Sequence, residues 1–394
     1  MDFFWLEWFY NYLKGVKMKL TKLSLIAALA VSTAMAGDAK ISGDAKVFYG
    51  TTDAGKADLF ADGTNTMGDA AVSLDYSRDI ADGVTFNAGM TGISTLGLEA
   101  TLVGDTWVNH ALKDRVWIDV ANLTAKVGST TAVIGRQKLD TPLAFTETWN
   151  IVENTFDAFT FVNSSLGDTT LVASAVTRAN GGEFTNIQGG MGDVGEAIYT
   201  VGAISNITSN IAAQGWYYNV AHADSQKVWL QADAQVTDAI SFGAQYAMAM
   251  ADKGDDASIM SAKLAYDAND VSLSAAFSKA NEDGQTDFAN YGGYGGSKVY
   301  TEAWWNFGYV TSPGAQAITV AAASKIAALD VTAQYTTVTN DSNAAADEMN
   351  EITLTATTKI GPVDATLALI NTSSDDDAVD GNTVQAYLTV PFSL

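Results

Sequence analysis

Residues 351–370 read EITLTATTKIGPVDATLALI, and apolar and polar side chains alternate along both halves of this stretch. Ile352 and Leu354 share one face of an extended chain, while the threonines beside them share the other. Successive side chains of a β-strand point to opposite faces, so a period of two predicts two strands, each with one apolar face. Gly361-Pro362 between them predicts a short turn. The stretch therefore predicts an antiparallel hairpin.

The same alternation recurs along most of the chain, for example in residues 228–236, 240–248 and 329–336. Each run has roughly the 9–11 residues that a tilted transmembrane strand needs. Short links and long polar links alternate, as in barrels that carry tight turns at one end and long loops at the other. The sequence therefore predicts an all-β protein, a transmembrane antiparallel β-barrel of about 18 strands. Residues 383–394 are expected to close it against residues 39–49.

The composition excludes several classes of protein. The 394 residues include 21 Lys and Arg against 45 Asp and Glu, a formal charge of −24. Phosphate backbones attract basic surfaces, so this balance excludes a nucleic-acid-binding protein. Cysteine is absent, which excludes disulfides and thiolate metal sites. Hydrophobic residues make up 47% of the chain and are interleaved with polar ones, as a sheet with one lipid face and one wet face requires.

The N-terminus has the pattern of an export signal. Residues 18–36 contain a basic start, an apolar run and the small-residue cleavage signal Ala34-Met35-Ala36. The apolar run is too short to span a bilayer, so these residues are interpreted as a cleavable signal peptide. Residues 1–17 are interpreted as a mis-assigned start or an extension. Residues 37–394 are then expected to form one barrel in the bacterial outer membrane.

Catalytic motifs are missing from the sequence. The chain has only His110 and His222, both in expected external loops, which is too few for a His-based metal cluster or a supported nucleophile–histidine arrangement. The glycine-rich run 292–296 has no lysine after it and no helical pattern, so it is interpreted as a loop and not as a phosphate-binding motif. The sequence predicts a protein that is not an enzyme and requires no cofactor.

One block of sequence resembles a known family. Residues 131–171 contain Gly135-Arg136-Gln137, then Leu139 and Thr141-Pro142, then an alternating strand and a short turn. This block resembles the major outer-membrane porins of epsilonproteobacteria, which are similar in turn to the OprD-like porins. The resemblance implies one barrel of about 18 strands, often assembled as a homotrimer. It also implies that the third external loop folds into the lumen and that cations pass preferentially.

The loop after Gln137 is the expected pore constriction, because it carries carboxylates and has no basic residue between Lys138 and Arg178. Rings of carboxylates select cations. Basic side chains facing them would create a transverse field across the pore. The expected acidic residues are Asp140, Glu147, Glu153 and Asp157, and the basic candidates are Arg115, Arg136 and Arg178. Strand parity leaves the face of Arg136 open, and ordinary loop charges are the alternative interpretation.

A divalent cation is a further candidate at this constriction, since hard cations prefer clustered oxygen ligands. The resemblance makes Asp140, Glu147 and Glu153 the expected ligands, with Ca²⁺ as the candidate ion. The acidic runs in other loops are more simply solvated charges.

The sequence leaves three candidate functions for the protein. The first is a porin for passive diffusion of small hydrophilic solutes with a preference for cations, surrounded by the lipid bilayer and lipopolysaccharide; a substrate-selective porin is its nearest relative. The second is a surface structural protein or adhesin that uses long loops such as 280–315, with incidental pore activity. The third is a secreted soluble β-sandwich.

Overall fold

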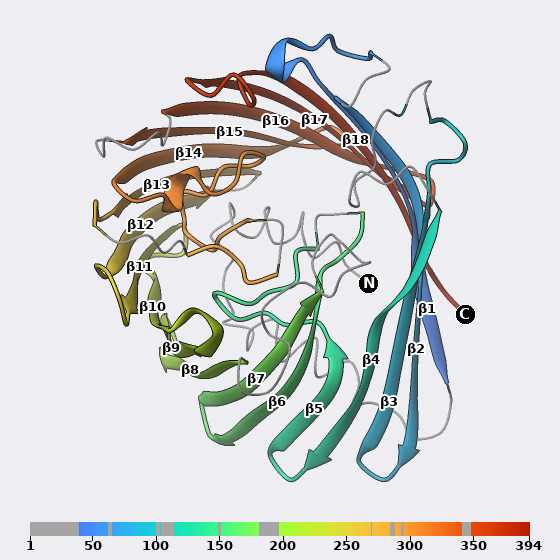
Figure 1. The fold of residues 1–394 in the computed structure, drawn as a ribbon, viewed down its shortest axis with the longest axis vertical. Helices are drawn as coiled ribbons and strands as arrows, with labels where there is room; N and C mark the ends of the chain where they lie inside the picture. The colour runs from blue at the N-terminus through green and yellow to red at the C-terminus, as the bar shows by residue number, and fades with distance from the viewer. Residues whose placement is uncertain are drawn as a thin grey trace.

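The alternating segments of the sequence form β-strands in the computed structural model (Figure 1). The structure describes residues 39–61, 65–99, 103, 114–148, 151–180, 197–268, 270–283, 288–292, 295–340 and 348–394. Within these ranges, 18 strands form one antiparallel sheet that closes into a barrel. The expected extension (1–17) and signal peptide (18–36) lie outside the described residues.

The strands follow one another around the barrel in chain order. They are β1 (Lys40–Thr52), β2 (Thr66–Ala81), β3 (Val84–Ser94), β4 (Arg115–Val127), β5 (Thr130–Gln137), β6 (Thr155–Leu166), β7 (Thr169–Asn180), β8 (Ile198–Thr208), β9 (Ile211–Val220), β10 (Ser225–Gln235), β11 (Ile240–Ala251), β12 (Ala257–Ala268), β13 (Val271–Ala280), β14 (Ala315–Ile326), β15 (Leu329–Asn340), β16 (Met349–Ile360), β17 (Val363–Ser374) and β18 (Gly381–Ser393).

The barrel closes where the first strand meets the last. β1 pairs with β2 on one side and with β18 on the other, in a register that runs from Ser42↔Ser393 to Thr52↔Thr383. Phe48 and Tyr387 are partners in this register, and their ring centroids lie 5.0 Å apart. Closure gives every strand of the sheet two neighbours, which removes the free edges where unfolding and aggregation start. The predicted pairing of the terminal strands is confirmed.

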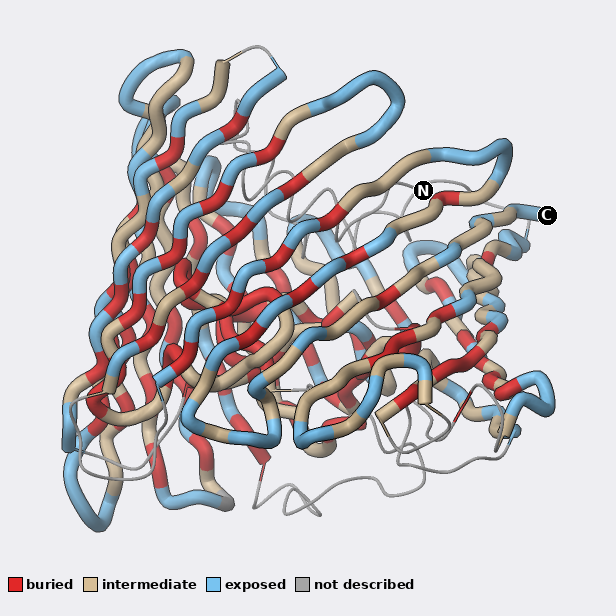
Figure 2. Tube along the Cα trace, turned by 90° about the horizontal axis from the view of Figure 1, so that it is seen from above, coloured by how far each residue is buried: buried red, intermediate tan, exposed pale blue. Residues whose placement is uncertain are grey.

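The faces of the barrel reverse the usual arrangement of a water-soluble protein. On β16, Glu351, Thr353 and Thr355 are almost fully buried, whereas Ile352 and Leu354 are 54% and 43% exposed. Figure 2 shows the same alternation of buried and exposed positions along neighbouring strands. Apolar side chains therefore face outward and polar ones inward. A closed barrel with this arrangement does not fit the soluble β-sandwich alternative.

Helical structure is minor in the described part of the chain. It consists there of three-residue 3-10 turns, η2 (Ala54–Lys56), η4 (Ala221–Ala223) and η5 (Tyr309–Thr311). No helix among the described residues is long and apolar enough to cross a bilayer. The sequence also allowed an extra strand in residues 298–309. The structure has no strand there, because the segment folds back as turns inside the barrel.

Short turns at one end of the barrel require glycine. Gly128, between β4 and β5, has φ 59°, and Gly361, between β16 and β17, has φ 61°. Positive φ is strained for residues that carry a Cβ, so glycine permits these tight links. The other end carries the longer connections, two of which fold into the barrel.

Gly202→Ala is expected to destabilise the barrel. Gly202 on β8 faces its partner Trp216 on β9, and a Cβ at this position would lie 2.2 Å from Trp216 Cε3. Overpacking of this kind costs about 1–3 kcal/mol. The variant should lose its compact, unboiled gel band at a lower temperature than the wild type. Gly92→Ala is the matched control, because its nearest neighbour lies at 3.4 Å; equal effects in both variants would contradict the packing argument.

Candidate pore constriction

Among the described residues, two connections fold into the barrel and narrow it. The 138–154 loop joins β5 to β6, and the 281–314 loop joins β13 to β14. Figure 1 shows both inside the ring of strands. The first is the third long connection in chain order, so the inward fold implied by the family resemblance is confirmed. The second was expected to be an external loop.

Buried apolar side chains explain why the 281–314 loop turns inward. Phe288, Val299 and Val310 are at most 2% exposed and belong to one buried cluster with Tyr218 and Trp229 of the barrel wall. A solvated external loop would not carry so many apolar groups. The aromatic residues among the glycines of this segment were therefore the sequence signal that could have placed it in the lumen.

The 138–154 loop reaches two opposite parts of the wall. Ile151 and Val152 pack with Phe48 of β1 and Ile93 of β3. The Leu143 backbone N–H donates to the Tyr218 hydroxyl of β9 at 3.3 Å. Because it is held on both sides, the loop crosses the interior of the barrel and does not lie along one wall.

The two inward loops are joined to each other. Asn290 accepts a hydrogen bond from the Phe145 backbone N–H (2.8 Å) and donates to the Glu147 carboxylate at 3.0 Å. Lys298 forms an ion pair with Asp140, and its Nζ lies 4.8 Å from the centroid of the Phe145 ring. Hydrogen bonds and an ion pair therefore join the two loops inside the barrel.

The far end of the 138–154 loop contacts β1 through charges. Glu153 is paired with Lys138 and lies 4.0 Å from Lys46 of β1, which in turn lies 3.7 Å from Asp44. Burial alone would raise the pKa of Glu153, but the charges of Lys138 and Lys46 outweigh burial and hold the pKa below its usual value. Glu153 is therefore ionised at neutral pH.

Lys138 is surrounded by negative charge. Burial alone would lower its pKa, but Glu153, Asp75 and Asp119 outweigh burial and hold the pKa above its usual value. Asp75 of β2 and Asp119 of β4 lie on either side of Gly89 of β3. Their Oδ1 atoms are 2.9 and 2.5 Å from where a Cβ of that residue would be. The small residue thus leaves room for two carboxylates on the inner wall beside the loop.

The expected acidic residues do not gather into one ligand set. Asp140, Glu147 and Glu153 each have their own partner: Lys298, Asn290 and Lys138 respectively. The described residues contain no group of three or more Asp, Glu or His side chains placed to hold a metal ion. Of the two histidines, His110 lies outside the described residues, and so does the side chain of His222. This placement does not favour the divalent-cation site.

Three expected constriction residues lie on the outer face of the wall. Arg136 pairs in register with Asp157, which pairs with Arg178. Along β5 and β6 these positions alternate in step with Ile134 and Phe159, each 45% exposed on the outer face. The lumenal position expected for Arg136, Asp157 and Arg178 therefore does not hold: strand parity turns Arg136 and Asp157 outward, and a β-bulge in β7 brings Arg178 beside Asp157.

Arg115 is the basic candidate that faces inward. It pairs in register with Ile93, which is 4% exposed, while its neighbour Val116 is 72% exposed on the outer face. Lys46, Lys138 and Lys298, which sequence reasoning did not select, supply the cations that contact the loop carboxylates. Lys46 was missed because the fold of the barrel brings β1 to the loop, and Lys298 because the contact between the two inward loops brings it there; Lys138 begins the loop itself.

One carboxylate of the wall holds three consecutive residues of the 281–314 loop. Glu351 of β16 is 1% exposed and accepts hydrogen bonds from the backbone N–H groups of Trp304, Trp305 and Asn306 at 2.8–3.0 Å. The Asn306 side chain adds a further bond at 2.9 Å. A carboxylate that satisfies three consecutive amides fixes the local loop conformation. Glu351 is therefore one polar anchor of the loop that can be removed by mutation, beside the hydrogen bonds that Gln245 and Gln334 of the wall make with Tyr300 and Glu302.

Comparisons with solved structures agree with this architecture. OccK8 (OprE) of Pseudomonas aeruginosa is 17% identical, with 92% of this chain and 100% of that chain covered and a TM-score of 0.74. The chain has the fold of the Occ porins. OccAB1 of Acinetobacter baumannii is 12% identical (92% and 98% covered, TM-score 0.73), as is a BenF-like porin from Pseudomonas fluorescens Pf-5 (92% and 100% covered, TM-score 0.73). No family model and no curated protein sequence matches.

The second inward loop, residues 281–314, contains a titratable carboxyl group, that of Glu302. Glu302 accepts a hydrogen bond from the Ser297 backbone N–H at 2.8 Å. Burial raises its pKa to about 7, although the hydrogen bonds from Ser297 and Ala303 oppose that rise. The loop therefore acquires a negative charge between mildly acidic and mildly alkaline pH.

Loop packing is expected to weaken as pH rises through 7. A carboxyl whose folded pKa is raised contributes stability that is fully present below its unfolded pKa and is lost as pH rises through its folded value, here about 7. The temperature at which the compact gel band is lost should therefore fall from pH 5 to pH 8. Glu302→Gln should reduce this fall, because it cannot ionise. An equal fall in both proteins would contradict the assignment.

Proposed function

We propose that this protein is an outer-membrane porin, a channel through which small hydrophilic solutes diffuse passively. The observation that carries the proposal is a closed barrel whose outer face is apolar, whose inner face is polar, and whose interior is narrowed by two joined loops. An apolar outer face suits a bilayer, and a polar interior with a constriction suits aqueous permeation. The porin fold of the solved structures supports the same function.

Export and location are part of the proposal. The signal-peptide pattern of residues 18–36 supports passage out of the cytoplasm, and the barrel supports residence in the outer membrane, with the bilayer and lipopolysaccharide around it. A homotrimer is proposed on the family resemblance. Catalysis and an essential cofactor are not proposed, and a Ca²⁺ ion at the constriction has no support from the arrangement of the carboxylates.

A preference for cations is proposed from the inner wall. Asp44, Asp75 and Asp119 lie on β1, β2 and β4 of the inner wall beside the 138–154 loop, in which Asp140 and Glu153 are paired with lysines. The formal charge of −24 adds a long-range field of the same sign. The negative wall, and not an acidic loop, is therefore the proposed source of selectivity.

Single-channel recording of the purified protein in a planar bilayer tests the proposal. We expect stepwise currents and, under a salt gradient, a reversal potential of the cation-selective sign. Neutralising both wall carboxylates, with Asp75→Asn and Asp119→Asn, should reduce that potential. An absence of steps would refute the channel, whereas steps with anion selectivity would keep the channel and remove the acidic filter.

The adhesin alternative is not favoured. Its motivation was a long external loop over residues 280–315, but Phe288, Tyr300 and Trp304 of this loop are buried inside the barrel. A segment that lines the interior does not present itself to a host or a neighbouring cell.

A further inference from the structure

An ion-paired trio lies on the outer face of the barrel wall. The Arg136 guanidinium contacts both oxygens of Asp157, with Nε–Oδ1 at 2.8 Å and Nη2–Oδ2 at 3.3 Å. Arg178 Nη1 lies 3.8 Å from the same carboxylate. Two cations therefore share one anion, and the trio keeps an excess positive charge.

These charges lie in an otherwise apolar wall. The outward residues next along the strands are Ile134 on β5 and Phe159 on β6, both well exposed. An arginine on the lipid face of a barrel costs about 2–4 kcal/mol at the bilayer midplane and less towards the interfaces. The side chains of Arg136 and Arg178 are nevertheless 23% and 38% exposed. An excess cation in this setting calls for an anionic partner from the surroundings.

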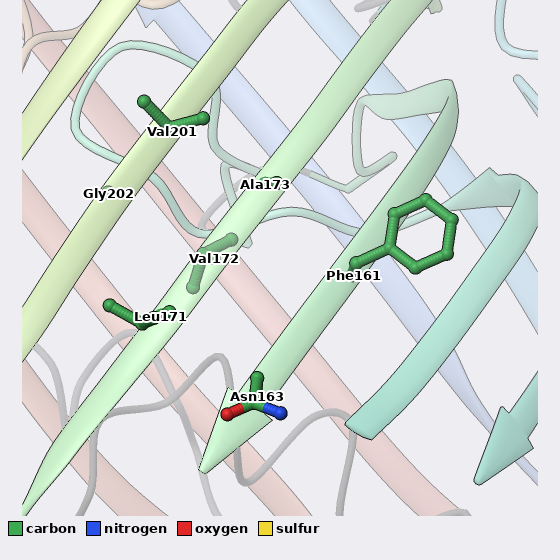
Figure 3. Close-up of a pocket in the computed structure, with 7 residues that line it drawn as sticks. All are labelled: Phe161, Asn163, Leu171, Val172, Ala173, Val201 and Gly202. Carbon is green, nitrogen blue, oxygen red and sulfur yellow. The ribbon is translucent and has the colours of Figure 1, made fainter. Parts of the chain in front are cut away.

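An apolar groove runs along β6, β7 and β8, two of which also carry the ion trio. Alanines of β7 form its floor: Ala173 lies in register between Phe161 of β6 and Val201 of β8, and Ala175 lies between Phe159 and Tyr199. Figure 3 shows Phe161 and Val201 on either side of Ala173 and Leu171. The part of the groove around Ala173 forms a pocket of about 290 Å³ with a predominantly apolar lining that includes Phe161, Leu171 and Val201. Its small-residue floor between bulky walls has the shape of a channel for an extended hydrocarbon chain.

The groove and the ion trio belong to one continuous surface. Ala173, Ala175 and Arg178 all lie on β7, and Phe161, Phe159 and Asp157 follow one another on the outer face of β6. The trio is at the end of these strands that leads to the long connections. A molecule with a hydrocarbon chain in the groove would hold its polar end beside the two arginines. Arginine forks match phosphate oxygens in geometry and charge.

We propose that this outer surface binds one lipid that carries a phosphate headgroup, with the phosphate at Arg136 and Arg178 and an acyl chain along Ala173 and Ala175. The site rests on the proposed membrane location but not on permeation, because none of its side chains faces the lumen. Asp157 holds the two arginines in place and leaves them one positive charge for the phosphate.

Native mass spectrometry of the detergent-purified full-length protein tests the site, with monophosphoryl lipid A as the probe and phosphatidylcholine as a lipid without net charge. Arg136→Gln combined with Arg178→Gln should weaken lipid A binding at least tenfold. Ala173→Leu combined with Ala175→Leu should also weaken it by filling the groove. Arg78→Gln is the matched control: this exposed residue is the register partner of the outward Phe86 on β3, away from the trio. It should bind as the wild type does.

Asp157→Asn separates charge recognition from simple damage to the wall. The variant loses the negative charge between the two arginines, so lipid A binding should be kept or strengthened. If the arginines instead served only to keep the wall folded, Asp157→Asn would lose lipid A binding. Unchanged binding in the double arginine variant would overturn the proposal. Equally tight binding of phosphatidylcholine would also overturn it. So would tight binding of inorganic phosphate alone, or the finding that the arginine changes break a dimer of two subunits.

The same preparations distinguish this site from the proposed channel function. Outward variants should leave single-channel conductance unchanged. A protein that binds lipid A through the arginines yet gives no current steps would refute the channel and keep the lipid site. If the protein conducts but its arginine variants bind lipid A as the wild type does, the lipid site is refuted and the channel is kept.

Discussion

Glu351→Ala is expected to produce a larger and noisier single-channel current than the wild type. The substitution removes the acceptor for the backbone N–H groups of Trp304, Trp305 and Asn306. Each buried amide left without an acceptor loses about 1–3 kcal/mol. The 281–314 loop should then leave the wall for part of the time and widen the passage. The measurement is the conductance histogram of single channels in a planar bilayer.

Two further variants make the result specific. Glu351→Gln keeps one acceptor oxygen and should give an intermediate current. Glu348→Ala removes the same type of side chain from an exposed position three residues earlier and should leave the current unchanged. A steady, wild-type conductance in Glu351→Ala would show that Glu351 does not hold the loop.

Lys138→Met is expected to make the channel more selective for cations. The substitution removes the positive charge of Lys138, which interacts electrostatically with Glu153, Asp75 and Asp119. A unit charge acting over roughly 7 Å of water contributes about 0.6 kcal/mol, close to RT. Cation permeability should rise and anion permeability fall by roughly threefold each, so the cation-to-anion ratio should rise by roughly sevenfold. The reversal potential under a salt gradient measures this ratio.

Lys126→Met is the matched control, since this exposed lysine lies beside a short turn at the other end of the barrel. It makes the same change in net charge and should shift the potential much less. Glu153→Gln should shift it in the opposite direction to Lys138→Met. Equal shifts in the two lysine variants would mean that net charge, and not the constriction, determines selectivity.

The barrel could be predicted from the sequence because its signal is local. The alternation at residues 351–370 reports both the strand and its apolar face, and the pairing of β1 with β18 follows from closure. The inner site depends on register instead. Lys46 meets Glu153 across about a hundred residues of chain, and no spacing rule indicates that contact.

Two predictions made from the sequence were wrong, and each has a physical explanation. Arg136, Asp157 and Arg178 were expected in the lumen because they lie in or near an acidic segment. The period of two along β5 and β6 turns Arg136 and Asp157 outward, and a β-bulge in β7 places Arg178 beside them. The 281–314 loop was expected outside because it is glycine-rich. Its aromatic residues, which include Phe288 and Trp304, determine its position by packing on the inner wall.

Backbone closure has a consequence for how this chain can change over time. The hydrogen bonds that join β1 to β18 complete a ring that depends little on which side chains face the water inside. Such a ring tolerates wide divergence, which agrees with a shared fold at 12–17% identity. Substitutions on β2 to β4 can therefore alter what crosses the passage while assembly proceeds as before. The same property makes the barrel a scaffold whose interior can be re-engineered as a molecular sieve.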